Sequence, residues 1–530
     1  MRVLFFMILM LPLVLHTSAQ STAAKPKLVV GIMVDGLQHR HIEQLWTRFE
    51  PNGFKRLTGQ GAHFSRIASN IVSAGNTPDI ATIMTGTVPY YHGVTASTVL
   101  NRTNGFYESI FFDRNQAGVE TDLKLSAKNL LASTWIDELV LANRGLSKSY
   151  VVALNAEDAI ALGGHASHCV LWMDDSELKW STTGYYAGRM PWQALEMNIT
   201  GSFQNYVNRV WTPLFPLNTY IAATSDKIPS NFEYKPGDRR NERSKRTWLK
   251  ATPSANSLVT DLGWRLINEE GLGKDLITDA IMLQFTVRTP NEKNFSLQTV
   301  EKEDIYLRLD RELQFLMQKI ESTVGYDHVL FVLFGNQMAT YSPDELKEYN
   351  INAGYFNANR SMALLNSYLM ALYGQEKWVL GYYGKNIYLN KAKIEEKNMN
   401  FADFQRVVSD FIVEFEGVQS ASSYIHLMYV APHPSSDLAR VRNSVHRKTA
   451  GDVIITLMPG WLEVDDNTNP VGESNDLISY LPLYLSGWKI GKQTIDKQYQ
   501  IIDIAPTISR ILQTPNTNAN LGSPMEMQLR

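Results

Sequence analysis

Apolar runs alternate with helical patterns along most of the chain after its first twenty residues. The run Lys27–Asp35 (KLVVGIMVD) stays apolar until it ends in an acid, which is typical of a buried parallel strand. Five further runs predict strands: Ser149–Asn155, Ala280–Val287, His328–Phe334, Asp452–Met458 and Leu481–Ser486. Apolar residues at helical spacing occur between or after these runs, over His41–Leu57, Asn129–Asn143, Ser257–Gly271, Lys302–Thr323 and Asp503–Leu512. The alternation predicts an α/β fold with helices on both faces of a parallel sheet, and a site outside the carboxyl ends of its strands.

Two stretches interrupt this alternation and suggest how the chain is divided. Residues 172–252 are rich in Trp, Tyr, Asn, Pro and Arg and predict a loop-rich cap insertion. Residues 354–429 contain a strand, a helix and a strand and predict a small β-α-β subdomain. The remaining segments, 20–171, 253–353 and 430–530, would form the core.

The first nineteen residues have the pattern of a secretory signal peptide. Arg2 is followed by an apolar run to Leu15 and by small residues that end at Ala19. A membrane-spanning helix needs ~20 apolar residues, so the run is too short to cross a bilayer. No cysteine lies near Ala19, which argues against a lipoprotein anchor. We therefore expect a periplasmic or secreted protein with no transmembrane segment in its mature part.

Composition narrows the functional classes. The 530 residues include 50 Lys+Arg and 53 Asp+Glu, a formal net charge of −3, and 44% are hydrophobic, which is typical of a globular protein. The near-neutral balance argues against a dedicated nucleic-acid binder, because phosphate contacts need clustered basic residues. Cys169 is the single cysteine, so no internal disulfide can form, and we expect a buried thiol. An exported chain without disulfides suits a bacterial periplasm.

Several motifs occur in an order that resembles the alkaline phosphatase superfamily. After the first strand come GNTPDIATIMTGTVPYYHG, EDIYLRLDREL, GDVIITLMPGW and DIAPTISRIL, which together span nearly the whole mature chain. The likeness is strongest to the periplasmic phosphate-irrepressible phosphatase branch, which is related to nucleotide pyrophosphatase/phosphodiesterases. It implies a three-layer α/β/α sandwich.

The resemblance also implies a site that can be compared position by position. Active members hold two zinc ions with six protein ligands and attack phosphorus with a Thr or Ser. The first ligand position is Asp35, which is retained. The nucleophile position is Asn76, with Thr77 as its neighbour. The remaining five ligand positions carry other residue types, namely Thr289, Lys293, Gly335, Asn336, and Ser479 or Tyr480.

The positions that would hold substrate oxygens have changed as well. A Lys-x-Arg pair appears as Asn155 and Glu157, and an Asn appears as Ser97. Zinc requires imidazole, thiolate or carboxylate ligands, and one carboxylate alone cannot retain it. We therefore expect a catalytically degenerate member, a pseudoenzyme that uses the fold to bind a ligand or protein partner of the cell envelope. On this interpretation we expect neither a bound cofactor nor a defined substrate-binding residue.

Two alternatives stay open. One is an active hydrolase of phosphate mono- or diesters or sulfate esters with a rearranged zinc site and Thr77 as nucleophile, which would need His and acidic residues from the cap. The other is an assembly factor of the envelope. Thr77 also suits a helix N-cap, since it precedes Pro78 and Asp79. Asp35 suits a turn cap before Gly36.

Other polar features favour structural roles. His165 and His168, beside Cys169, and the pair Asp327-His328, which precedes its strand, are expected to be structural or in a surface turn. The basic stretch Arg239–Arg246 predicts a solvated loop, with docking to an acidic partner or lipid phosphate as the alternative.

Overall fold

The computed structural model describes residues 25–224, 231–239, 242–290, 297, 299–336, 341–466 and 480–530. The expected signal peptide lies outside these residues. Among the helices described, none is both long and apolar enough to cross a membrane.

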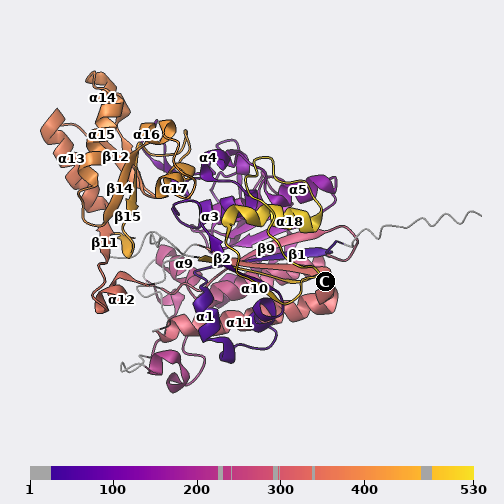
Figure 1. The fold of residues 1–530 in the computed structure, drawn as a ribbon. Helices are drawn as coiled ribbons and strands as arrows, with labels where there is room; N and C mark the ends of the chain where they lie inside the picture. Colours follow the sequence, from indigo (N-terminus) through magenta and orange to yellow (C-terminus); the bar gives the residue numbers. More distant parts are fainter. Residues whose placement is uncertain are drawn as a thin grey trace, which may run out of the picture.

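A mixed, mostly parallel sheet forms the middle layer (Figure 1). Its centre is β1 (Leu28–Asp35), which pairs in parallel with β9 (Asp279–Thr286) and β10 (Val329–Gly335). Outward from β9 the sheet continues through β6 (Ser149–Ala153), β7 (Cys169–Met173), β8 (Trp180–Thr183) and β5 (Gly118–Val119). Outward from β10 it continues through β17 (Tyr480–Gly487), β2 (Ala62–Ala68) and β18 (Gln493–Ile495), and β19 (Tyr499–Gln500) also pairs with β2. The predicted α/β fold is confirmed, with β17 antiparallel to both of its neighbours.

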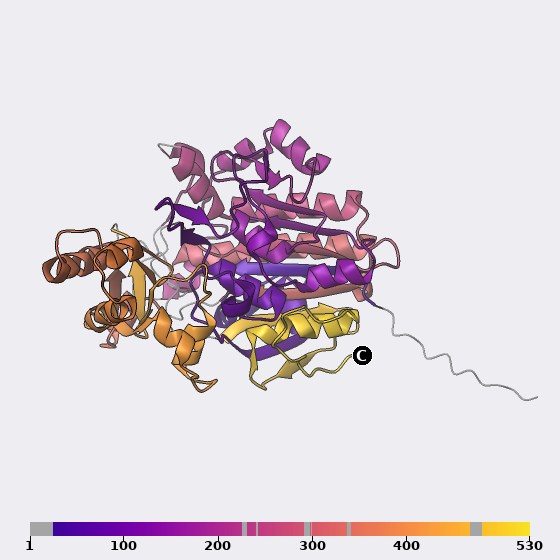
Figure 2. The same cartoon turned by 90° about the horizontal axis from the view of Figure 1, so that it is seen from above.

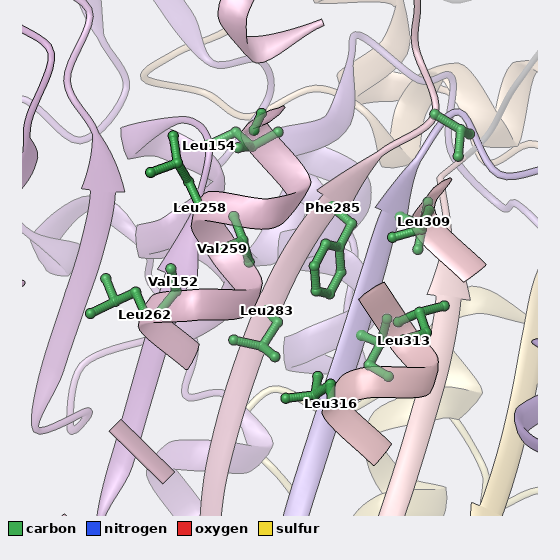
Figure 3. Packing of buried hydrophobic residues seen from close by; sticks show 14 of the residues in the cluster. Val152, Leu154, Leu258, Val259, Leu262, Leu283, Phe285, Leu309, Leu313 and Leu316 are labelled. Carbon is green, nitrogen blue, oxygen red and sulfur yellow. The ribbon is translucent and has the colours of Figure 1, made fainter. Parts of the chain in front are cut away.

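Helices cover both faces of this sheet (Figure 1). One face carries α10 (Pro253–Glu269) and α11 (Val300–Thr323). Leu and Val side chains of α10 pack against β6 and β9, and Leu side chains of α11 belong to the same apolar cluster (Figure 3). The other face carries α3 (Asn76–Thr85), α5 (Trp135–Ala142), α6 (Ala156–Gly163) and α18 (Ile504–Leu512). The central strands are buried on both sides, which explains their continuous apolar sequences.

The N-terminal helix expected over His41–Leu57 is two helices. They are α1 (His39–Gln44) and α2 (Phe54–Gly59), separated by a 3₁₀ turn and the Pro51–Gly53 segment. The physical reason is that proline lacks an N–H and restricts the residue before it, so the helical spacing cannot continue as one helix.

The cap segment is more ordered than its composition suggested. Within 172–252, β8 extends the central sheet, and α7 (Trp192–Ile199), α8 (Ser202–Val207) and α9 (Glu242–Lys250) are helices. The expected loop at Arg239–Arg246 is therefore partly wrong, because its end belongs to α9 and Arg246 is buried. Several cap aromatics pack inward: Trp180, Phe203, Trp211, Tyr220 and Phe232 belong to the core cluster that also contains residues of α10.

The small subdomain protrudes to one side of the sandwich (Figure 2). Its four-stranded sheet has the order β12 (Val379–Tyr383), β13 (Asn386–Leu389), β15 (Val453–Leu457) and β14 (Val418–Ser423). Helices α13 (Ala358–Tyr373), α14 (Lys391–Glu396) and α15 (Phe401–Ile412) belong to it, and a short parallel pair lies beside it, β11 (Gly354–Asn357) with β16 (Trp461–Val464). The expectation that Asp452–Met458 joins the central sheet is wrong, because β15 lies between β13 and β14.

Candidate functional site

The ends of three neighbouring strands and the start of one helix meet at a single edge of the sheet. β1 ends at Asp35, β10 ends just before Asn336, and Arg288 follows β9 by two residues. Helix α3 begins at Asn76. Because β1, β9 and β10 run in parallel, their carboxyl ends lie at the same edge, where sites of α/β sheets form.

A polar network connects these four side chains. The Asn336 Nδ2 group donates to Asp35 Oδ1 at 3.0 Å and to Asn76 Oδ1 at 2.6 Å. Asn336 Oδ1 accepts from the Gly36 N–H at 2.9 Å. Arg288 Nε donates to Asp35 Oδ1 at 3.1 Å. The Asp35 carboxylate thus accepts hydrogen bonds from the Asn336 amide and the Arg288 guanidinium. Asn336 also accepts a hydrogen bond from the backbone of the turn that follows Asp35.

The side chains around Asp35 differ in kind from the ligands of a zinc pair. Zinc binds His nitrogen, Cys sulfur or carboxylate oxygen. Here Asp35 faces Asn336 and Asn76, while Arg288 adds a positive charge that would repel a divalent cation. Across the described part of the chain, no three His, Cys, Asp or Glu side chains gather in a way that could hold a metal ion. The residues around Asp35 therefore do not fit a zinc pair.

Thr77 faces away from this network and into the protein interior. Its hydroxyl donates to Asp158 Oδ1 at 2.7 Å, and the Thr77 side chain is buried. Gln284 Nε2 donates to the other oxygen of Asp158 at 2.7 Å, and burial raises the pKa of the Asp158 carboxyl. The N-cap position of α3 is Gly75 with φ 109°, so the expected cap by Thr77 is wrong. The pair places a carboxylate next to a hydroxyl, in an environment closed to solvent.

The positions that would hold substrate oxygens are engaged differently. Ser97 Oγ lies 2.9 Å from the Tyr383 hydroxyl of the small subdomain. Asn155 Oδ1 accepts from Lys250 Nζ of α9 at 3.2 Å. Glu157 occupies the first turn of α6, and burial raises the pKa of its carboxyl. Glu157 therefore places an acidic side chain where the resemblance implies a basic one.

The remaining predicted positions contribute little to the network. Thr289 follows Arg288 after β9, and Tyr480 begins β17, where Arg66 lies over its ring at 5.8 Å. Gly335 is the last residue of β10 and has no side chain to offer. Lys293 and Ser479 lie outside the described residues.

Sequence reasoning missed Arg288, which supplies the cation at Asp35. The available signal was its position just beyond a buried strand, on the edge where the other candidates converge. Its neighbour Thr289 was identified because it matches a ligand position, whereas Arg288 matches none.

Histidines outside this edge have structural contacts. His41 is buried, its Nδ1 lies 3.1 Å from the Tyr306 hydroxyl, and burial lowers its pKa to about 2. The backbone N–H of His165 donates to Asp137 at 2.7 Å. Asp327 and His328 lie in an exposed 3₁₀ turn before β10, at the opposite end of that strand from Asn336. Cys169 is a buried free thiol, as expected.

Comparisons with known proteins identify relatives along almost the full length. The family described as "Type I phosphodiesterase / nucleotide pyrophosphatase" matches residues 29–479. A Myroides odoratus protein named "Calcium-transporting ATPase" is 26% identical over 96% of this chain and 95% of its own. Alkaline phosphatase PafA of Elizabethkingia meningoseptica is 25% identical over 96% of this chain and 95% of its own.

Solved structures share the architecture. The crystal structure of wild-type alkaline phosphatase PafA superimposes with a TM-score of 0.86, at 23% identity, over 96% of this chain and 99% of that one. The three-layer arrangement inferred from the motifs is therefore that of this phosphatase.

Proposed function

The chain belongs to the type I phosphodiesterase / nucleotide pyrophosphatase family. From that premise we propose that it is a catalytically degenerate member that binds a ligand or partner at the sheet edge around Asp35. One observation supports this proposal above all. Where the family chemistry needs metal ligands, Asp35 is hydrogen-bonded to Asn336 and paired with Arg288.

The physical argument concerns charge. Two zinc ions would neutralise phosphate oxygens and lower the pKa of the attacking hydroxyl. In this chain one guanidinium already neutralises Asp35, and an amide fills the space between Asp35 and Asn76. Removing Arg288 would still leave a single carboxylate, which is too few ligands for zinc.

A second candidate function rests on the contact between Thr77 and Asp158. A hydroxyl 2.7 Å from a carboxylate has the arrangement of a nucleophile and its base. This would make the chain a hydrolase of phosphate or sulfate esters that works without the family's usual ligand set. The burial of both side chains disfavours it, since a substrate would have to displace part of α3 to reach them.

The pattern of residues 1–19 and the near-neutral charge of the chain support a proposal about cellular location and partners. We propose export by a signal peptide over residues 1–19 and a role in the bacterial cell envelope, with a protein or small ligand as partner and no nucleic acid. An assembly role in the envelope is the variant of this proposal in which the partner is membrane-associated.

A turnover screen tests the degenerate character. The purified mature chain, supplied with Zn²⁺, is assayed with p-nitrophenyl phosphate, bis-p-nitrophenyl phosphate and p-nitrophenyl sulfate. We expect wild type, Asp35→Ala and Thr77→Val to give the same background rate. Zinc-dependent turnover that disappears in Asp35→Ala would contradict the proposal, and turnover that disappears only in Thr77→Val would favour the second candidate.

A further inference from the structure

A small cavity opens beside the cap, where the start of α10 meets the middle of α11. Its volume is about 140 Å³. Ser254 and Ser257 of α10 line it, together with Arg308 and Arg311 of α11. The two helices lie on the same face of the sheet (Figure 1), and the segment after α8, which includes Arg209, completes the wall. Typical ligand pockets measure ~300–1,000 Å³, so this cavity suits a small chemical group.

The two arginines of α11 keep unused hydrogen-bond donors. A guanidinium carries several N–H donors and no acceptor. Arg308 Nε donates to Asp304 Oδ2 at 2.6 Å and Nη2 donates to the Thr212 carbonyl at 2.8 Å, while Nη1 has no hydrogen bond within the described chain. Arg311 has a distant contact with an acid, 3.9 Å from Nε to Glu50 Oε1. Both side chains can therefore donate to a further acceptor.

Arg209 is less constrained than these two arginines. Its side chain is exposed, it forms no ion pair with a carboxylate of the described residues, and its guanidinium lies over the Tyr206 ring at 4.5 Å. Stacking on an aromatic ring leaves the N–H groups at the edge of the guanidinium plane available, and their fork matches the oxygens of a carboxylate or phosphate. Arg209 is thus the cation of the wall that a ligand could engage without breaking an existing ion pair.

Ser254 supplies two more donors at the start of α10. It is 5% exposed, and neither its hydroxyl nor its backbone N–H has a hydrogen-bond partner in the part of the chain that the structure describes. Pro253 has no N–H, so the Ser254 amide is the first of the helix. The N-cap residue Thr252 does not accept from it, because the Thr252 hydroxyl donates to the Leu249 carbonyl at 2.8 Å. Buried donors normally meet an acceptor, and a ligand oxygen would supply one.

Glu312 is the acid among the described residues of the wall, and it already has a partner. The Ser257 hydroxyl donates to Glu312 Oε1 at 2.5 Å, and burial raises the pKa of the Glu312 carboxyl. The acids behind the wall have cations of their own: Asp304 with Arg308, Glu50 with Arg311, and Asp261 with Arg265. The described charges around the cavity therefore nearly balance, and its preference comes from the excess of donors over acceptors.

We propose that this cavity binds the oxyanion of a small molecule, a carboxylate, phosphate or sulfate group that is free or ends a larger compound. Guanidinium donors from Arg209, Arg308 and Arg311 would hold the oxygens, and the Ser254 donors at the N-terminus of α10 would face the same negative charge. The cavity shares no lining residue with the polar network around Asp35. The inference therefore goes beyond the proposed function and does not depend on it.

Isothermal titration of the full mature chain with phosphate, sulfate and acetate, each at constant ionic strength, tests this. We expect at least one of them to bind with a Kd of about 1 mM or tighter. Arg209→Gln should weaken binding at least about tenfold, because a charge-assisted hydrogen bond is lost. Ser254→Ala should weaken it about threefold, and Glu312→Gln should strengthen it about threefold by removing a negative charge from the wall. Arg406→Gln, a matched loss of one exposed cation on the small subdomain, should leave it unchanged.

The opposite effects of Arg209→Gln and Glu312→Gln separate ligand recognition from a loss of folding, which could only weaken binding. Binding of phosphate and sulfate alone would support a tetrahedral oxyanion as the ligand, and binding of acetate alone would support a carboxylate. Binding of none of the three, or equal affinity in wild type and Arg209→Gln, would overturn the inference. Loss of binding in Arg288→Gln without loss in Arg209→Gln would place the anion at the sheet edge around Asp35 and would also overturn it. The proposed function is decided separately, by zinc and turnover.

Discussion

Asp304→Ala is expected to lower the free energy of unfolding by about 3–5 kcal/mol, because removing one partner of a buried charged network leaves the other partners uncompensated. Asp304 lies on α11 and is fully buried. Its two oxygens accept from Trp211 Nε1 at 2.6 Å, the Leu214 N–H at 2.7 Å, the Tyr220 hydroxyl at 2.6 Å and Arg308 Nε at 2.6 Å. Three of these donors, Trp211, Leu214 and Tyr220, belong to the cap. The Asp304 carboxylate therefore links the cap to the core through hydrogen bonds.

Urea unfolding of wild type and Asp304→Ala measures the effect, and limited proteolysis shows whether the cap becomes the first site of cleavage. Asp261→Ala is the matched control, because Asp261 forms a partly exposed pair with Arg265 at 3.0 Å and should cost less than about 1 kcal/mol. A loss for Asp304→Ala no greater than that of the control would show that the cap is held by its apolar contacts alone.

Phe285→Ala should cost about 3–5 kcal/mol by leaving a cavity between the sheet and its helical layer. Phe285 lies on β9 and is fully buried (Figure 3). It belongs to the cluster that also contains Leu258 of α10 and Leu309 of α11. The adjacent Thr286 is in register with Asp35 on β1, so the same substitution should loosen the edge that carries the polar network.

The loss is measured by thermal and urea unfolding. Phe285→Leu keeps most of the volume and should cost less than about 1.5 kcal/mol. Phe106→Ala removes the same side chain from an exposed loop position and should change stability by less than about 0.5 kcal/mol. Equal losses for Phe285→Ala and Phe106→Ala would contradict the described packing.

The central strands could be predicted from sequence because burial on both faces removes polar residues from them. β1, β6, β9, β10 and β17 all coincide with apolar runs. β2 (AHFSRIA) was missed, because His63, Ser65 and Arg66 interrupt its apolar positions, and of these three only Arg66 is exposed. An apolar run predicts that a strand is buried, but it does not predict which sheet the strand joins. For this reason β15 was assigned to the wrong sheet.

The positions of the candidate-site residues at the strand ends could be predicted from the sequence, but their side-chain contacts could not. Asp35, Asn76 and Asn336 were found because their places follow from strand ends and motif order. The pairing of Arg288 with Asp35 and the inward turn of Thr77 depend on side-chain direction. Sequence spacing constrains those directions weakly at loops, so neither contact could be inferred.

Zinc stoichiometry tests the loss of the metal site most directly. The mature chain is expressed with added zinc, dialysed against metal-free buffer and analysed by mass spectrometry for bound metal, with Asp35→Ala treated identically. We predict no retained zinc in either protein, because Arg288 and Asn336 occupy the surroundings of the one remaining carboxylate. Stoichiometric zinc in wild type that is lost in Asp35→Ala would contradict a catalytically degenerate site.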